Sequence, residues 1–194
     1  MTIRRGEEWG VPVDRPAELL VLGSDAQLAA HDGASPIAPG AGDLYETLGS
    51  PPLDRPVVQR VEVDGVRVVL DGAAERWAIA HVVARRSWWR GPVVAAMNVS
   101  QLGAWRVAPR AHPNDGLLDL IEAAPELPWR ARWAARSRLP AGAHVPHPQI
   151  TLRRAERASW TFGRPMRVWI DGVEIGRARQ LDVEVVPDRY TVHF

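Results

Sequence analysis

The sequence predicts an α+β chain that is mainly β, an antiparallel β-sandwich preceded by a short α/β segment. Two observations support this fold class. From residue 57 onward, apolar and polar residues alternate in short stretches that are separated by turns containing Gly, Pro or Asp. Residues 1–56 are instead rich in Gly, Pro and Ala. We therefore expect two regions, 1–56 and 57–194, of which the second forms the sandwich.

The first region contains one predicted strand and two short helical segments. AELLVLG (17–23) has the composition of a short buried strand, and SDAQLAAHDG (24–33) that of a short helix or loop. Asp43 precedes Glu46 by three residues, which is the spacing of a capping box, and Gly49 follows as a stop. We expect a helix of about one to two turns between Asp43 and Gly49.

The second region is predicted to consist almost entirely of strands. VVQRVEVDGVRVVLDG (57–72) alternates on both sides of Asp64-Gly65, which indicates a hairpin. MRVWIDGVEIG (166–176) repeats this pattern around Asp171-Gly172. The other expected strands are 75–87, 92–103, 116–124, one or two within 150–162, 181–187 and 189–194.

One helix interrupts the predicted strands, ELPWRARWAARSRLPAG (126–142). It holds four arginines and, after its first residue, no acid. Trp129 and Trp133 are spaced i,i+4, with Arg132 and Arg136 beside them. Two interpretations remain open: the tryptophans pack on the sandwich while the arginines are solvated, or this face binds an anionic membrane surface.

Composition excludes several classes of function. The chain has no cysteine, so it has no disulfide and no thiolate nucleophile. The net charge of +1 does not indicate nucleic acid as a partner, and all 24 residues counted as Lys or Arg are arginine. No apolar run follows the first arginines, and 92–99 is too short to span a bilayer. His144 and His147 have a metal-like spacing, but the prolines around them favour a structural loop. We expect a cytoplasmic protein, peripheral to the membrane if the helix binds lipid.

Two pairs of acids are candidates for chemistry. Asp115 and Asp119 stand four apart around a glycine, which suits either a turn before a strand or a site for a hard cation such as Mg²⁺. Asp171 and Glu174 belong to the second predicted hairpin, where a carboxylate can act as a general base or simply be solvated. Spacing alone favours the turn and the solvated hairpin.

Three segments carry a more specific pattern. They are SPIAPGAGDLYETLGSP (35–51), VVAAMNVSQLGAWRVAPRAHPNDGLLDL (93–120) and PMRVWIDGVEIGRARQLDVEVVP (165–187). Together they resemble the diacylglycerol kinase and sphingosine kinase family of lipid kinases, which includes soluble bacterial members. The matching positions are Gly40, Gly42, Asp43, Leu48, Gly49, Asn98, Ala108, Pro109, Asp115, Gly116, Leu118 and Asp119.

This resemblance implies a nucleotide-binding half, a β-sandwich half and ATP in the cleft between them. Phosphoryl transfer to a lipid hydroxyl would then depend on MgATP. Glu174 or Asp171 would be the base, and Asp115 would bind a cation with backbone carbonyls near His112 and Leu117. The phosphates would lie near residues matching the family's glycine-rich turns, which are Gly23, Asp25, Gly40 and Gly42.

The sequence also departs from the family. Ser24 and Ala26 replace two glycines of the phosphate loop, Gln27 replaces a threonine, and only about 20 residues precede this loop, fewer than one βα unit of about 30 residues. Residues 1–56 are therefore interpreted as a truncated remnant of the nucleotide domain. Two functions follow: a lipid kinase, or a non-catalytic module that binds a lipid or another amphiphilic small molecule. A homodimer or a partner chain could restore the missing half.

Overall fold

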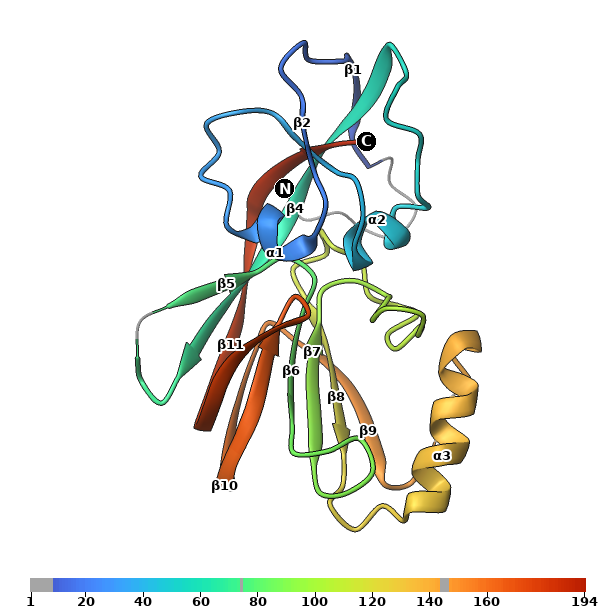
Figure 1. The fold of residues 1–194 in the computed structure, drawn as a ribbon, viewed down its shortest axis with the longest axis vertical. Helices are drawn as coiled ribbons and strands as arrows, with labels where there is room; N and C mark the ends of the chain where they lie inside the picture. The colour runs from blue at the N-terminus through green and yellow to red at the C-terminus, as the bar shows by residue number, and fades with distance from the viewer. Residues whose placement is uncertain (1–8, 74, 144–146) are drawn as a thin grey trace.

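The computed structural model describes residues 9–73, 75–143 and 147–194. Within these residues, eleven strands form one sheet in the order β1-β4-β11-β10-β6-β7-β8-β9, with β2, β3 and β5 attached beside this path (Figure 1). Neighbouring strands are antiparallel, except that β3 runs parallel to β2 and β11. The strands are β1 (Val11–Asp14), β2 (Leu20–Leu22), β3 (Ile37–Pro39), β4 (Val57–Leu70), β5 (Arg76–Ala78), β6 (His81–Arg85), β7 (Val93–Met97), β8 (Leu118–Ala123), β9 (Ile150–Ala155), β10 (Arg157–Ile170) and β11 (Val173–His193). The helices are α1 (Asp25–Ala29), α2 (Asp43–Thr47), α3 (Trp129–Arg138) and the 3₁₀ turn η1 (Leu139–Ala141).

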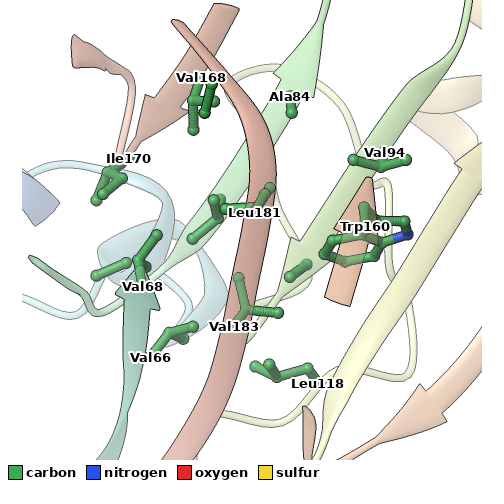
Figure 2. Close-up of a cluster of buried hydrophobic side chains, with 14 of the residues drawn as sticks. Val66, Val68, Ala84, Val94, Leu118, Trp160, Val168, Ile170, Leu181 and Val183 are labelled. Carbon is green, nitrogen blue, oxygen red and sulfur yellow. The ribbon is translucent and has the colours of Figure 1, made fainter. Parts of the chain in front are cut away.

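The sheet curls around a central hydrophobic core. Strands β4, β10 and β11 contribute buried side chains that pack with those of β6, β7 and β8 in a single cluster (Figure 2). Alternation with a period of two places these side chains on one face of each strand. The cluster confirms the predicted fold class, a mainly β, antiparallel, sandwich-like chain. Its labelled members are Val66, Val68, Ala84, Val94, Leu118, Trp160, Val168, Ile170, Leu181 and Val183.

A second cluster joins the N-terminal residues to the other end of the sheet. Leu28 of α1 and Leu44 of α2 are fully buried and pack in one cluster with Val63 of β4 and the buried Tyr190 of β11. The Tyr190 hydroxyl donates to the carbonyl oxygen of Ala29 at 3.1 Å. α1 and α2 therefore cover this end of β4 and β11 (Figure 1). The division at residues 56 and 57 stays a prediction.

A third cluster lies on the outer face of β6, β7 and β8. Val83, Met97 and Ile121 are buried there against the half-buried Trp88 and Trp105. α3 lies at the periphery of the molecule near this face (Figure 1). No helix in the described parts of the chain is both long and apolar enough to cross a membrane.

The hairpin predicted at 57–72 is wrong, because β4 continues through Asp64-Gly65 as one strand paired with β11. The irregularity lies in the partner, where Asp188 has φ of 54° in a bulge. Gly65 is needed here for packing, because a Cβ at this position would stand 2.6 Å from Cδ of Arg189. Asp64-Gly65 is thus a close crossing of two long strands and not a turn.

Three smaller expectations also change. The segment 75–87 divides into β5 and β6, because residues 79 and 80 form a bend. The two closing strands are one strand, β11. Asp43 is the first residue of α2 and not its cap. Gly42 occupies the cap position, and as a glycine it has no side chain to make a capping hydrogen bond.

The second predicted hairpin is present. Asp171 and Gly172 have φ of 47° and 80° and connect β10 to β11. Both residues therefore have the positive φ that a tight two-residue hairpin turn requires. The short helix after residue 24, the helix before Gly49 and the helix within 126–142 are also found where the sequence places them.

Candidate functional site

Four polar side chains from separate elements gather where α1 and α2 meet the start of β6. They are Asp25 of α1, Asp43 of α2, His81 of β6 and Asp171 of the β10–β11 turn. Asp25, His81 and Asp171 are buried. Asp25 and Asp171 were expected as site residues, whereas Asp43 was expected only as a helix cap and a position that matches the family pattern, and no role was expected for His81.

Asp25 caps α2 from the neighbouring helix. Its carboxylate accepts hydrogen bonds from the backbone amides of Asp43 at 2.6 Å and Leu44 at 3.2 Å. These amides are the unpaired donors at the start of α2. Burial, and after it the charge of Asp171, raises the pKa of Asp25 to about 6, although the two amide bonds oppose this shift.

Asp171 is held by backbone amides of the segment between β5 and β6. One carboxylate oxygen accepts from Ile79 at 2.9 Å, and the other accepts from Ala80 and His81, also at 2.9 Å. Burial raises the pKa of Asp171, although the positive charge of His81 and the three amide bonds oppose it. The turn at Asp171 is therefore fastened to the bend that starts β6.

His81 links this anchor to α2. Its Nε2 lies 2.7 Å from Oδ2 of Asp43, and the other oxygen of Asp43 accepts from the amide of Gly103 at 2.6 Å. Burial lowers the pKa of His81, but the hydrogen bond to Asp43 and the charges of Asp171, Asp43 and Asp25 more than offset it, so the pKa is raised. The ring therefore contacts one carboxylate, that of Asp43, while its buried Nδ1 has no hydrogen-bond partner among the described residues.

The residues expected near ATP phosphates form no open cradle. The carboxylate of Asp25 already occupies the amides at the start of α2, and a Cβ on Gly42 would stand 2.6 Å from that carboxylate. A Cβ on Gly40 would meet Val21 at 2.5 Å, and the amide of Gly23 donates to the side chain of Gln27 at 2.9 Å. Backbone amides that bind phosphate must be free to face the ligand. The chain's own groups fill these positions, so the residues do not fit the phosphates, and ATP binding stays a prediction without support from these contacts.

Glu174 lies apart from this cluster. Its side chain is exposed and stands 4.0 Å from Nε of Arg167, on the paired strand β10. Asp171, three residues earlier, is buried among the amides described above. The structure therefore brings Asp171, and not Glu174, to Asp25 and His81. The role of either residue as a base stays a prediction.

The predicted cation residues share one loop, which an arginine from β9 closes. Oδ1 of Asp115 accepts from the amide of Leu117 at 3.1 Å, and its Oδ2 pairs with Arg154. Nδ1 of His112 accepts from the amide of Asn114 at 3.3 Å. Burial lowers the pKa of His112, which favours the neutral ring.

These contacts give mixed support for a cation. Asp119 is buried, and this burial raises its pKa to about 6. Its Oδ2 has no hydrogen-bond partner, which is expected of an oxygen that binds a cation when the cation is absent. However, Arg154 Nε stands 3.4 Å from the other oxygen of Asp119 and already supplies positive charge. In the ranges that the structure covers, no three His, Cys, Asp or Glu side chains converge as a metal centre. Mg²⁺ stays a prediction. His144 lies outside the described residues, and Nδ1 of His147 accepts from the amide of Gln149.

Asp64 holds this loop, a role that its sequence pattern did not indicate. Its two oxygens accept from the amides of Gly116 at 2.8 Å and Asp188 at 3.0 Å. The side chain of Asn98 donates to the carbonyl oxygen of Asp64 at 2.9 Å. Asp64 is fully buried, and this burial raises its pKa to about 6. An Asp-Gly pair in an alternating stretch usually indicates a turn, so the sequence offered no signal for this buried anchor.

A cavity of about 110 Å³ lies between α3 and the outer face of β7 and β8. Its wall is almost wholly apolar and aromatic, and two arginines of α3 complete it. The tryptophans of the wall pack together, since the rings of Trp88 and Trp105 meet edge to face at 5.4 Å. Residues that line the cavity include Trp88, Trp89, Trp105, Ile121, Arg132, Ala135 and Arg136.

Arg132 fixes α3 over this cavity. It is 5% exposed and donates to four carbonyl oxygens: Nε to Leu127 at 2.9 Å, and the two terminal nitrogens to Ala124 at 2.9 Å, Gly91 at 2.5 Å and Trp88 at 3.4 Å. No carboxylate pairs with it in the described residues, and burial lowers its pKa. The first interpretation of this helix is therefore wrong in orientation: Arg132 is inside, and Trp129 and Trp133 are outside, 63% and 62% exposed.

Comparisons with known proteins place this arrangement in a family. Residues 52–194 match the family described as YegS C-terminal NAD kinase beta sandwich-like domain. No curated protein matches the sequence. Among solved structures, a diacylglycerol kinase of Bacillus anthracis str. Sterne is similar at 15% identity and a TM-score of 0.60, over 90% of this chain and 75% of its own.

Two further structures from the same organism, assigned provisionally as diacylglycerol kinases, give TM-scores of 0.65. Their identities are 13% and 15%, each alignment covers 90% of this chain, and it covers 77% and 76% of theirs. At such identities the likeness shows the fold alone. The matched segment includes the second and third sequence patterns that indicated a lipid kinase. The chain belongs to the YegS C-terminal domain family of lipid kinase-like proteins.

Proposed function

We propose that this chain is a lipid-binding module of the lipid kinase family that holds the apolar tail of an amphiphile in the cavity beneath α3. The observation that carries the proposal is the cavity itself, because its wall is apolar and aromatic. Small-molecule sites combine such walls with a few polar groups that orient the ligand. The absence of an open phosphate cradle at Gly40 and Gly42 favours binding over phosphoryl transfer.

The volume sets the size of the group that fits. An apolar cavity of roughly 150 Å³ accepts benzene, so about 110 Å³ suits a short segment of an alkyl chain. Each buried methylene contributes about 0.8 kcal/mol, so a segment of about four methylenes contributes about 3 kcal/mol. Affinity in the micromolar range therefore requires a polar contact or further burial along the surface of α3.

Arg136 is the candidate for that polar contact. Its side chain lines the cavity and is exposed, and its guanidinium lies 5.3 Å from the ring of Trp89 and 4.9 Å from that of Trp105. Arg132 cannot serve equally well, because its donors are already bound to carbonyl oxygens. A carboxylate or phosphate head would therefore lie near Arg136, with the tail directed toward Ile121.

The test is calorimetric titration of the full chain with decanoate below its micelle concentration. Ala135 lines the cavity, and Ala134, also half-buried, does not. Ala135→Leu should fill the space and weaken binding by about tenfold or more, since about two methylenes of contact are lost. Ala134→Leu, with the same change in volume on the same helix, should leave binding within about twofold. Equal binding by the two variants, or no saturable binding by the natural chain, would refute the proposal.

Phosphoryl transfer is the second candidate, and the gathering of Asp25, Asp171 and His81 favours it. Clustered buried groups with raised pKa values are typical of functional sites. In this reaction the γ-phosphoryl group of ATP would bond to a lipid hydroxyl oxygen, ADP would leave, and a carboxylate would take the hydroxyl proton. A rise in melting temperature with MgATP that Mg²⁺ alone does not cause would support this candidate. No shift at millimolar MgATP would dismiss it.

A further inference from the structure

The outer face of α3 presents tryptophans and arginines to solvent. Trp129, Trp133 and Trp89 are 63%, 62% and 41% exposed, and they are the only large aromatic side chains among the exposed large hydrophobic residues of the described chain. Large rings are normally buried in a soluble protein, and contiguous exposed ones indicate a binding surface. Figure 1 shows α3 at the edge of the molecule, where its outer side has no covering element.

The order of residues around α3 gives this face a defined composition. At about 100° per residue, Arg136, Trp129, Trp133 and Arg130 follow one another around one side of the helix. Arg132 faces the protein, as its four carbonyl partners show. The two tryptophans are therefore flanked by one exposed arginine on each side.

Charge identifies the partner of this face. The segment 127–155 contains six arginines and no Asp or Glu, although the whole chain is nearly neutral. The exposed Arg130, Arg136 and Arg138 form no ion pair with any described residue. Instead, Arg130 stands 5.4 Å from the ring of Trp129. Tryptophan beside unpaired arginine is the composition of helices that lie in the interface of a membrane.

We infer that α3 docks this chain on an anionic lipid bilayer, with Trp129 and Trp133 in the headgroup region and Arg130 and Arg136 on lipid phosphates. This docking rests on the proposed function, because binding of a lipid gives the chain a reason to reach a membrane. The helix holds its own position through Arg132, so docking requires no refolding of α3. The same helix roofs the cavity, which places the cavity at the bilayer surface.

The test is co-sedimentation of the full chain with vesicles of phosphatidylcholine, with and without phosphatidylglycerol, at low and high salt. The chain should sediment with the anionic vesicles at low salt and be released at high salt. Arg130→Gln should weaken this binding about fivefold, the effect of about 1 kcal/mol for one basic residue at the surface. Arg138→Gln is the matched control, because Arg138 lies opposite the tryptophans on the same helix.

The tryptophans are tested by the double variant W129A/W133A, which should reduce binding to both kinds of vesicle. V11A/V57A is its control, since Val11 and Val57 are 54% and 49% exposed on β1 and β4. Equal binding to neutral and anionic vesicles, equal effects of Arg130→Gln and Arg138→Gln, or no vesicle binding would overturn the inference. So would a concentration-dependent dimer that W129A/W133A abolishes without any vesicle binding.

Failure here is separable from failure of the proposed function. Decanoate titration is done without vesicles and reports only on the cavity. A chain that binds decanoate but no anionic vesicle retains the proposed function and loses the docking face. A chain that binds vesicles through α3 but no decanoate retains the docking face and loses the cavity ligand.

Discussion

Replacing Arg132 with methionine should destabilise the protein by about 3 kcal/mol. Three of its four hydrogen bonds are 2.9 Å or shorter. A hydrogen bond to a charged group contributes about 1.5–3 kcal/mol, so three contribute about 4.5–9 kcal/mol. Burial of an unpaired guanidinium costs several kcal/mol and removes most of that gain. Methionine keeps the apolar stem, so the net loss is about 3 kcal/mol, mainly from carbonyl oxygens left without donors.

Urea denaturation of the natural chain and Arg132→Met measures this loss directly. For a chain of this size the melting temperature should fall by about 6–12 °C, taking about 2–4 °C per kcal/mol. Hydrogen exchange should accelerate first in the amides of α3, because Arg132 joins this helix to the loops at Gly91 and Ala124. Arg136→Met is the control, and we expect less than about 0.5 kcal/mol from this exposed position.

A loss of less than about 1 kcal/mol in Arg132→Met, or equal losses in the two variants, would show that these hydrogen bonds do not hold α3 in place. Arg132→Lys provides a second check. Lysine keeps the positive charge but lacks the planar set of donors that reaches several carbonyl oxygens at once. Stability close to that of the natural chain in Arg132→Lys would show that charge alone holds α3.

Three further predictions concern buried groups and glycines. Asp64 has a pKa of about 6 in the folded chain, above its ordinary value of 3.8. Its protonated form therefore stabilises the fold by up to about 3 kcal/mol. This contribution is complete below about pH 4 and is lost as pH rises through 6. Asp64→Asn should flatten that part of the stability profile in urea titrations; an unchanged slope would contradict the assigned pKa. Gly42→Ala should lower the free energy of unfolding by more than about 2 kcal/mol, because Gly42 has φ of 109° and an added Cβ would press on Asp25. Gly163→Ala, where a Cβ would meet open space, should change it by less than about 1 kcal/mol. Similar unfolding free energies of the two variants would argue against the capping of α2 by Asp25. Gly65→Ala should cost about 1–3 kcal/mol through its contact with Arg189, and a neutral result in the same assay would contradict the close crossing.

Periodicity predicted the fold class well because alternation reports which face of a strand is buried. The stretches that became β7, β8, β10 and β11 alternate or are short and apolar, and both patterns survive folding. Asp171-Gly172 was predicted correctly as a turn, since both residues adopt positive φ. Asp64-Gly65 has the same two residue types as Asp171-Gly172, but it lies within a continuous strand. Only the long partner β11, more than a hundred residues away, decides that this pair stays extended.

The candidate site was predicted only in part, for a similar reason. The family resemblance indicated Asp25 and Asp171, and these two side chains do share a cluster. His81 joins them because its Nε2 lies 2.7 Å from Oδ2 of Asp43, and a single histidine in an apolar strand carries no local signal of this contact. The orientation of α3, with Arg132 buried and both tryptophans exposed, could not be predicted either. Arginine is rarely buried without a carboxylate, so its four carbonyl partners could not be inferred from helical spacing.

The location of the bound tail decides most directly whether the cavity beneath α3 is a ligand site. Nuclear magnetic resonance of the indole N–H groups, with a fatty acid that carries a nitroxide near its methyl end, reports which tryptophans lie beside that end. A tail bound in the cavity should selectively broaden the signals of Trp88 and Trp105, which line it, while those of Trp160 and Trp77 stay sharp. Sharp signals from Trp88 and Trp105, or equal broadening of all four, would contradict a ligand site beneath α3.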